Sequence, residues 1–160
     1  MRSEQEINRA VELYSDTVKR ICVLYLKNAY DTEDIFQEVF LKYALSSVLF
    51  ENPQHEKAWI IRVTINQCKD FLKSFMRKQS VPIEDIVSVT YPSETGCPDV
   101  LEAVLSLPQK YKDVIYLHYY EGYSAAEISK ILGKNVNTVY TLTARAKDKL
   151  KAKLGGCEIE

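Results

Sequence analysis

Apolar residues recur at steps of three and four along most of the chain, and this spacing is the strongest constraint on its fold. Such steps place side chains on one side of an α-helix, whereas a half-buried strand needs strict alternation. The first run predicts a helix over about residues 4–27, with an apolar face of Ile7, Val11, Tyr14, Val18, Ile21, Cys22 and Tyr25. No segment predicts a strand, so we expect an all-α protein.

Two further helices are predicted in the first half of the chain. The second is expected to begin with Asp31 or Thr32 as its cap. Its buried residues would be Ile35, Phe36, Val39, Phe40 and Tyr43. After a loop through residues 51–53, the third is expected over about residues 56–76, burying Ile60, Val63, Thr64, Cys68, Phe71, Leu72 and Phe75.

The helical pattern stops between residues 79 and 97. This segment contains Pro82, Pro92, Gly96 and three acidic residues but no basic residue, which is typical of a linker. We therefore expect two small helical domains joined by a flexible linker at residues 79–97. Residues 1–78 would form a three- to four-helix bundle, and residues 98–160 a four-helix domain.

The last two helices have the sequence pattern of a helix-turn-helix. Ser124 and Glu127 fit a capping box, in which each side chain accepts a hydrogen bond from the other residue's backbone amide. Gly133 is expected to end this short helix, and Asn135 or Asn137 to open a longer basic helix that reaches about residue 154. A short helix, a glycine turn and a longer basic helix are typical of this DNA-binding motif.

The net charge of −1 hides three strongly charged stretches. Residues 57–78 contain six basic residues and one acidic residue, and residues 134–153 have the same balance, so each stretch carries +5. Residues 31–38 contain four acidic residues and no basic residue. Charges segregated in this way indicate three separate contact surfaces.

The last helix has the residues that a duplex-reading helix needs. Polar side chains near its start would face base edges, and basic side chains around them would hold phosphates. The candidates are Lys134, Asn135, Asn137, Thr138, Tyr140, Thr141, Arg145 and Lys149. The alternative is a solvated lysine-rich helix of a helical bundle.

The first basic stretch has a similar organisation. Arg62, Asn66, Lys69 and Lys73 follow one another at steps of four, three and four, and so share a helix face that could follow phosphates. Trp59 lies one turn earlier, where it could border an unstacked base or simply belong to the core.

The acidic stretch has three interpretations. Asp31, Asp34 and Glu38 could complement a helix N-terminus, dock a basic partner or bind a metal ion. Metal is the weakest of these, because no histidine or second acidic helix completes a ligand set. The four cysteines, Cys22, Cys68, Cys97 and Cys157, are widely spaced and indicate neither zinc nor disulfides. We predict no catalytic residues, no cofactor and no small-molecule substrate.

The chain is also expected to be cytoplasmic and not inserted in a membrane. Its apolar runs are far shorter than the roughly 18 residues of a spanning helix. Residues 1–6 carry acidic side chains where a signal peptide would need an apolar stretch.

Taken in order, these segments resemble the extracytoplasmic-function (group four) sigma factors of bacterial RNA polymerase. The resemblance is carried by Asp-Thr-Glu-Asp-Ile-Phe-Gln-Glu-Val-Phe at residues 31–40 and by Lys-Ala-Trp-Ile-Ile-Arg-Val-Thr-Ile-Asn at residues 57–66. It continues with Leu107-Pro108, with residues 122–133 and with Val-Asn-Thr-Val at residues 136–139. Altogether it spans about residues 8–153.

The resemblance implies a set of partners and roles. Asp31, Asp34, Gln37, Glu38 and Phe40 would dock on core RNA polymerase. The opened minus-ten promoter element would be engaged by Lys57, Trp59, Arg62, Asn66, Lys69 and Lys73, with one base extruded into the loop at residues 46–55. The last helix would read the minus-thirty-five element, and an anti-sigma factor would hold the protein inactive.

One departure affects the last helix. The family commonly has arginine and then leucine where this chain has Leu142 and Thr143, so either its DNA contacts or its core packing differ. Two alternative functions remain beside the sigma-factor interpretation. The main one is a stand-alone helix-turn-helix transcription regulator. The second is a metal-dependent enzyme that uses the carboxylates of the acidic stretch.

Overall fold

The computed structural model describes residues 1–26, 29–79 and 100–154. Regular structure in these residues is entirely helical, which confirms the prediction of an all-α protein. The chain divides into two compact units, Met1–Ser80 and Val81–Glu160. All of the predicted linker except Gln79 lies outside the described residues. Among the described helices, none has the length and apolar character needed to cross a membrane.

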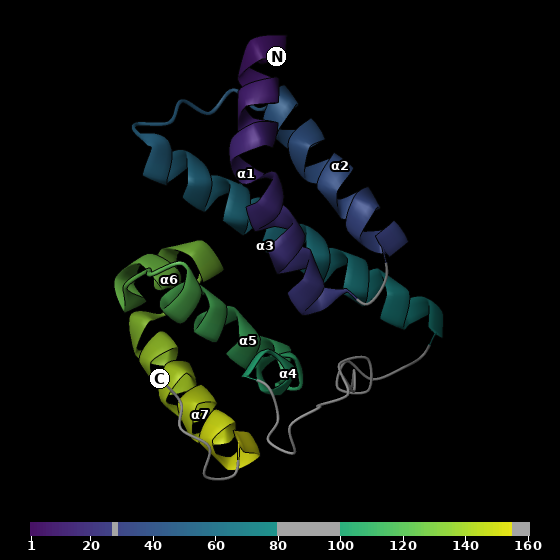
Figure 1. Cartoon of the computed structure of the whole chain (residues 1–160). Helices are drawn as coiled ribbons and strands as arrows, with labels where there is room; N and C mark the ends of the chain where they lie inside the picture. The colour runs from purple at the N-terminus through teal and green to yellow at the C-terminus, as the bar shows by residue number, and fades with distance from the viewer. Residues whose placement is uncertain (27–28, 80–99, 155–160) are drawn as a thin grey trace. The chain divides into compact units, whose positions relative to one another are not determined.

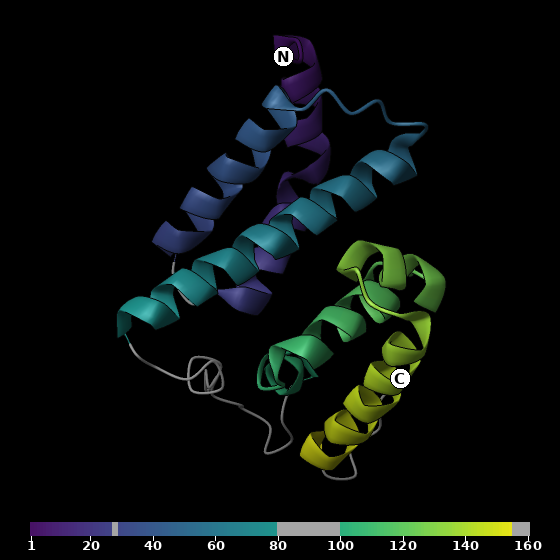
Figure 2. The ribbon, with the colours of Figure 1, turned by 180° about the vertical axis from the view of Figure 1, so that it is seen from behind.

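The first unit consists of three helices: α1 (Glu4–Tyr25), α2 (Ala29–Leu45) and α3 (Pro53–Gln79). Each packs against the other two, as the front and back views show (Figure 1, Figure 2). Their contact surfaces bury apolar side chains at helical spacing, including Val18, Ile21, Val39, Ile60 and Ile61. The unit is therefore held together by one apolar core.

The second helix begins earlier than predicted. α2 starts at Ala29, so the prediction that Asp31 or Thr32 caps it is wrong. Alanine has the highest helix propensity, which favours extending the helix by two residues. Asp31 instead lies in the first turn, where the helix dipole favours a negative charge.

The third helix also begins earlier than predicted, at Pro53. Oδ1 of Asn52 accepts a hydrogen bond from the backbone N–H of His55 at 2.8 Å, as a capping side chain does. Pro53 then occupies the first helical position, where its missing N–H is not needed. Residues 51–53 were predicted to form a loop, but Asn52 and Pro53 mark the start of α3.

A buried carboxylate joins the three helices of the first unit. Glu56 at the start of α3 is only 5% exposed. Nη2 of Arg9 on α1 donates to its two oxygens at 3.0 and 2.8 Å. The hydroxyl of Tyr14 on α1 donates to Oε1 at 2.8 Å, and that of Tyr43 on α2 donates to Oε2 at 2.9 Å. We call these four residues the Glu56 cluster.

The cluster keeps Glu56 ionised despite its burial. Burial alone raises the pKa of this carboxyl, but the hydrogen bonds from Arg9, Tyr14 and Tyr43 outweigh it, and the net pKa is lowered from 4.5. Burial, together with the bond to Glu56, raises the pKa of the Tyr14 hydroxyl to about 12. Both changes favour the observed state, a carboxylate that accepts from neutral phenols.

The second unit is built around its last helix. It contains α4 (Val100–Leu105), α5 (Gln109–Ile115), a π-helical turn η2 (Tyr116–Tyr120), α6 (Ala125–Leu132) and α7 (Val136–Leu154). The helix α7 packs against α4, α5 and α6. Its buried side chains form one stripe, Val139, Leu142, Ala146, Leu150 and Leu154. An amphipathic helix with this stripe leaves its opposite face exposed.

Replacing Glu56 with alanine is expected to destabilise the first unit by about 3 kcal/mol, because two buried phenolic hydroxyls lose their acceptor. Urea unfolding followed by tryptophan fluorescence measures this directly, since the only tryptophan of the chain, Trp59, lies in that unit. Glu12→Ala, which removes an exposed carboxylate from α1, serves as the control and should change stability by less than about 0.5 kcal/mol.

The pH dependence provides a second check with Glu56→Gln, which retains an acceptor but cannot ionise. Because the folded-state pKa of Glu56 is lowered, its ionic contribution is present above the unfolded pKa and disappears as the pH falls through the folded pKa. The stability difference between wild type and Glu56→Gln should therefore shrink on acidification. A difference that stays constant between about pH 7 and pH 3 would contradict this role.

Candidate functional site

The acidic residues of α2 lie on its outer surface. Asp34, Gln37 and Glu38 are exposed, and Asp31 is half-buried. Their spacing places all four on one side of the helix, opposite the buried Ile35, Val39 and Tyr43. We call Asp31, Asp34, Gln37 and Glu38 the acidic face.

Phe40 is not part of this exposed surface. It is 6% exposed, and its ring lies 4.8 Å from that of Phe36. The side chain therefore belongs to the core of the first unit. Its contribution to a surface contact would be to fix α2 on the neighbouring helices.

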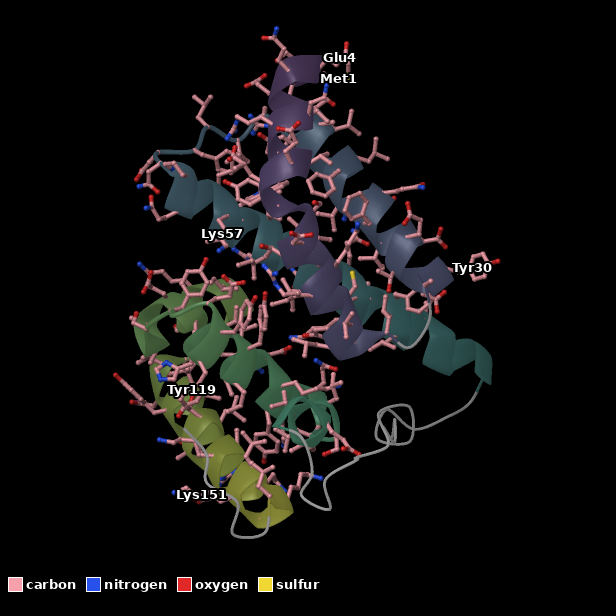
Figure 3. All side chains as sticks on the ribbon, in the orientation of Figure 1. Met1, Glu4, Tyr30, Lys57, Tyr119 and Lys151 are labelled. Atoms are coloured by element: carbon pink, nitrogen blue, oxygen red, sulfur yellow. The ribbon has the colours of Figure 1, made fainter. Side chains whose placement is uncertain are left out.

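The acidic face continues into exposed leucines that the sequence analysis did not identify. Leu41 is 52% exposed and Leu45 is 62% exposed. They follow Asp34 and Glu38 at steps of three and four, so one stripe of α2 is acidic at its start and apolar at its end. Tyr30, 87% exposed, projects from the first turn of the same helix (Figure 3). An exposed apolar stripe beside charged residues indicates a contact surface.

The basic residues of α3 form a second surface. Arg62, Asn66 and Lys73 are exposed, whereas Lys69 is half-buried. On the continuous helix their spacing places all four on one side, which we call the basic face. Lys57 is half-buried and lies two residues before Trp59, hence on nearly the opposite side of α3. The helix therefore separates Lys57 from the basic face.

Trp59 lies at the end of the basic face within a group of aromatic rings. Its ring contacts Tyr43 edge-on at 6.1 Å and Phe50 at 5.7 Å. His55 contacts Phe50 in the same manner at 5.4 Å. Trp59 is half-buried, so it supports the loop before α3 and keeps part of its surface at the border of the basic face. The contacts confirm that Trp59 packs in the first unit, and its role toward an unstacked base stays a prediction.

The turn between α6 and α7 has the geometry predicted for a helix-turn-helix. Oγ of Ser124 accepts from the N–H of Glu127 at 3.2 Å, and Oε1 of Glu127 accepts from the N–H of Ser124 at 3.1 Å. Gly133 ends α6 with a φ of 66°, a left-handed conformation that glycine adopts without strain. Oδ1 of Asn135 then accepts from the N–H of Asn137 at 2.8 Å. The capping box, the glycine stop and the asparagine start are all confirmed.

The predicted DNA-reading residues lie on the outer side of α7 or just before it. Asn137, Thr138, Tyr140, Thr141 and Arg145 are exposed on the helix. The side-chain oxygen of Asn135 is engaged by the cap, and Lys134 is half-buried in the turn. The ammonium group of Lys149 lies 5.5 Å from the ring of Tyr111. The geometry thus concentrates exposed polar groups in the first half of α7.

The departure at positions 142 and 143 concerns packing. Leu142 is 7% exposed and belongs to the buried stripe of α7. Thr143 is half-buried, and its hydroxyl donates to the carbonyl oxygen of Val139 at 2.8 Å. Leu142 therefore packs into the core of the second unit, and the hydroxyl of Thr143 is engaged by its own helix.

No metal site is found within residues 1–26, 29–79 and 100–154, where no group of three histidine, cysteine or acidic side chains could hold an ion. Cys22 and Cys68 are buried cysteines in the thiol form. Cys97 and Cys157 lie outside the described residues. The described side chains form three polar surfaces: the acidic face, the basic face and the outer side of α7.

Comparison with known proteins agrees with this division. Residues 10–80 match the family Sigma-70 region 2, and residues 98–150 match the family Sigma-70, region 4. The RNA polymerase sigma factor SigV of Bacillus subtilis is 35% identical over 130 residues, covering 79% of this chain and 78% of that protein. The ECF RNA polymerase sigma factor SigW of the same organism is 27% identical over 163 residues, covering 90% of this chain and 86% of SigW.

A solved structure has the same fold at low sequence identity. The sigma factor RpoE, in complex with the anti-sigma factor NepR from Bartonella quintana, gives a TM-score of 0.73 at 17% identity, covering 96% of this chain and 99% of that chain. The two family matches follow one another in the order of the two units, and SigV extends the likeness along most of the sequence. The chain belongs to the sigma-70 family, within the extracytoplasmic-function group of alternative sigma factors of bacterial RNA polymerase.

Proposed function

We propose that the chain binds core RNA polymerase through the acidic face and directs it to promoters through the basic face and α7. The observation that carries this proposal is the division of the chain into two units, each matching a sigma-factor region and each exposing a polar helix face. The chain would act by binding alone and catalyse no reaction. Its place of action would be the cytoplasm, with the polymerase and the chromosome.

The stripe along α2 has the properties of a docking surface. Its acidic residues would meet basic residues of the polymerase, and such complementarity steers association. Leu41 and Leu45 would supply the apolar contact that the acidic residues lack. Phe40 would hold α2 in place from within the core.

Promoter recognition would use the two units in different ways. The basic face of α3 can follow the phosphates of one strand, and Trp59 lies where an unpaired base would enter. The first half of α7 presents amide and hydroxyl groups beside Arg145, as a helix in the major groove requires. The first unit would therefore trap the opened minus-ten element and the second would read the minus-thirty-five element.

The binding free energies of the two DNA contacts, one from each unit, would add once polymerase fixes their spacing. After the first contact has formed, the second is intramolecular. The free chain has a net charge of −1 and is expected to bind promoter DNA poorly.

We also propose regulation by an anti-sigma factor that covers the acidic face. The structural relative RpoE is in complex with an anti-sigma factor, NepR.

The proposed function predicts specific transcripts in run-off transcription with bacterial core polymerase and a library of randomised promoters. Transcripts should appear only when the chain is present, and the free chain should select no sequence from the same library. If the free chain instead selects palindromic duplexes and no transcripts form, a stand-alone helix-turn-helix regulator becomes the better account.

Reversing two charges of the acidic face should weaken polymerase binding. Asp34→Lys with Glu38→Lys is expected to raise the Kd for core polymerase by about tenfold or more, a change of about 1.4 kcal/mol. Glu12→Lys with Asp16→Lys is the matched control, because these exposed residues of α1 have the same spacing and give the same change in net charge. Fluorescence anisotropy of the labelled variant chain, titrated with core polymerase, measures both. Equal affinities for the two double variants would remove the docking role.

Shortening the polar side chains of the basic face should impair promoter opening. Arg62→Ala and Asn66→Ala are each expected to reduce the open-complex fraction by about tenfold, the scale of one lost base or phosphate contact. Permanganate reactivity of unpaired thymines reports opening, while anisotropy reports polymerase binding. Gln5→Ala, which shortens an exposed polar side chain of α1 away from the basic face, is the control. A loss of polymerase affinity without an opening defect would contradict this assignment.

A further inference from the structure

Arg2 reaches across the first unit to the end of α2. Its backbone N–H donates to the carbonyl oxygen of Ala44 at 2.8 Å, and its Nε donates to that of Tyr43 at 3.0 Å. These carbonyls belong to the last turn of α2, where backbone acceptors have no partner within the helix. A positive charge at a helix C-terminus is also favoured by the helix dipole. Arg2 therefore caps α2 from a distant part of the sequence.

The same side chain also binds the loop that follows. Nη2 of Arg2 donates to the carbonyl oxygen of Val48. The guanidinium carbon lies 4.6 Å from the ring centre of Tyr43 and 4.9 Å from that of Phe50, and these two rings are parallel to within 1°. Only 11% of the Arg2 side chain is exposed. A planar guanidinium can donate in its plane while its faces lie on aromatic rings, which an ammonium group cannot do.

Further contacts fix the rest of the loop, residues 46–52. Oγ of Ser46 accepts from the N–H of Val48 at 3.1 Å, and Nδ1 of His55 accepts from the N–H of Glu51 at 3.2 Å. In contrast, Leu49 is 89% exposed. The loop backbone is thus anchored at both ends while the side chain at its tip is free to meet a ligand.

We propose that Arg2 is a positioning residue for recognition of the minus-ten element. It holds residues 46–52 in one conformation, so that an unpaired promoter base meets a formed surface beside Trp59 and binding does not have to order the loop. This inference rests on the proposed function. It concerns a residue remote in sequence from both the acidic face and the basic face.

The test compares base discrimination by three variants of the full chain, each tagged at the C-terminus to leave Arg2 undisturbed. Transcription is measured on promoters in which each minus-ten position is changed in turn. Arg2→Ala and Arg2→Lys should both reduce discrimination at one or two positions by about tenfold, equivalent to about 1.4 kcal/mol. Glu6→Gln should match wild type, because glutamine preserves the capping box formed with Ser3 and only the 4.0 Å ion pair with Arg2 is lost.

A purely structural role would give a different result. Loss of stability would lower transcription from all promoters and polymerase affinity in parallel, without changing base preference, and this outcome would overturn the proposal. Unchanged discrimination in Arg2→Ala would overturn it as well. Failure of wild type to direct any specific transcript would instead defeat the proposed function itself.

Phe50→Leu supplies a second variant in case Arg2→Ala folds poorly. It removes one of the rings under the guanidinium and leaves all three helices intact. It should reduce discrimination at the same promoter positions. The double variant should lose less than the sum of the two single losses, because both substitutions release the same loop although Phe50 also contacts Trp59, and fully additive losses would contradict the proposal.

Discussion

The first unit depends on the ionised carboxylate of Glu56, which binds one helix to the other two. Helices held only by apolar packing can slide or rotate against one another at a small cost in free energy. A buried carboxylate keeps its three hydrogen bonds in only one arrangement of the helices. Arg9 and Tyr14 come from α1, and Tyr43 comes from α2. The cluster therefore fixes the orientations of α2 and α3 together. The Glu56 cluster therefore also fixes how the acidic face on α2 is oriented relative to the basic face on α3.

In the second unit the orientation of α7 is also fixed, but α7 has no buried charged group comparable to Glu56. The buried stripe of α7 is apolar, and the orientation of α7 is set by the turns at the two ends of α6. Gly133 in a left-handed conformation and the capping box at Ser124 determine where α6 begins and ends. These local signals lie within a few residues of one another. The outer side of α7 is consequently positioned by turn chemistry, while the surfaces of the first unit are positioned by contacts across the sequence.

This difference explains which features the sequence predicted. Helical spacing, the Ser124 box and the Gly133 stop are local patterns, and the structure confirms them. The start of α3 was misassigned because Asn52-Pro53 was taken for loop rather than cap and first turn. The roles of Arg2 and Glu56 depend on partners more than 40 residues away in the chain, apart from Tyr43 for Glu56, so no local pattern shows them. Helical spacing did predict the burial of Phe40, whereas the exposure of Leu41 and Leu45 depends on how α2 is rotated in the bundle.

The π-helical turn at Tyr116–Tyr120 has a consequence for how this sequence can change in length. Glu121 donates its N–H to the carbonyl of Tyr116, five residues back, so the turn contains one residue more than an α-helical turn would. Deleting one residue there would let α5 continue as regular α-helix up to the glycine turn. The second unit therefore has a place where evolution can remove a residue while α6 and α7 keep their positions.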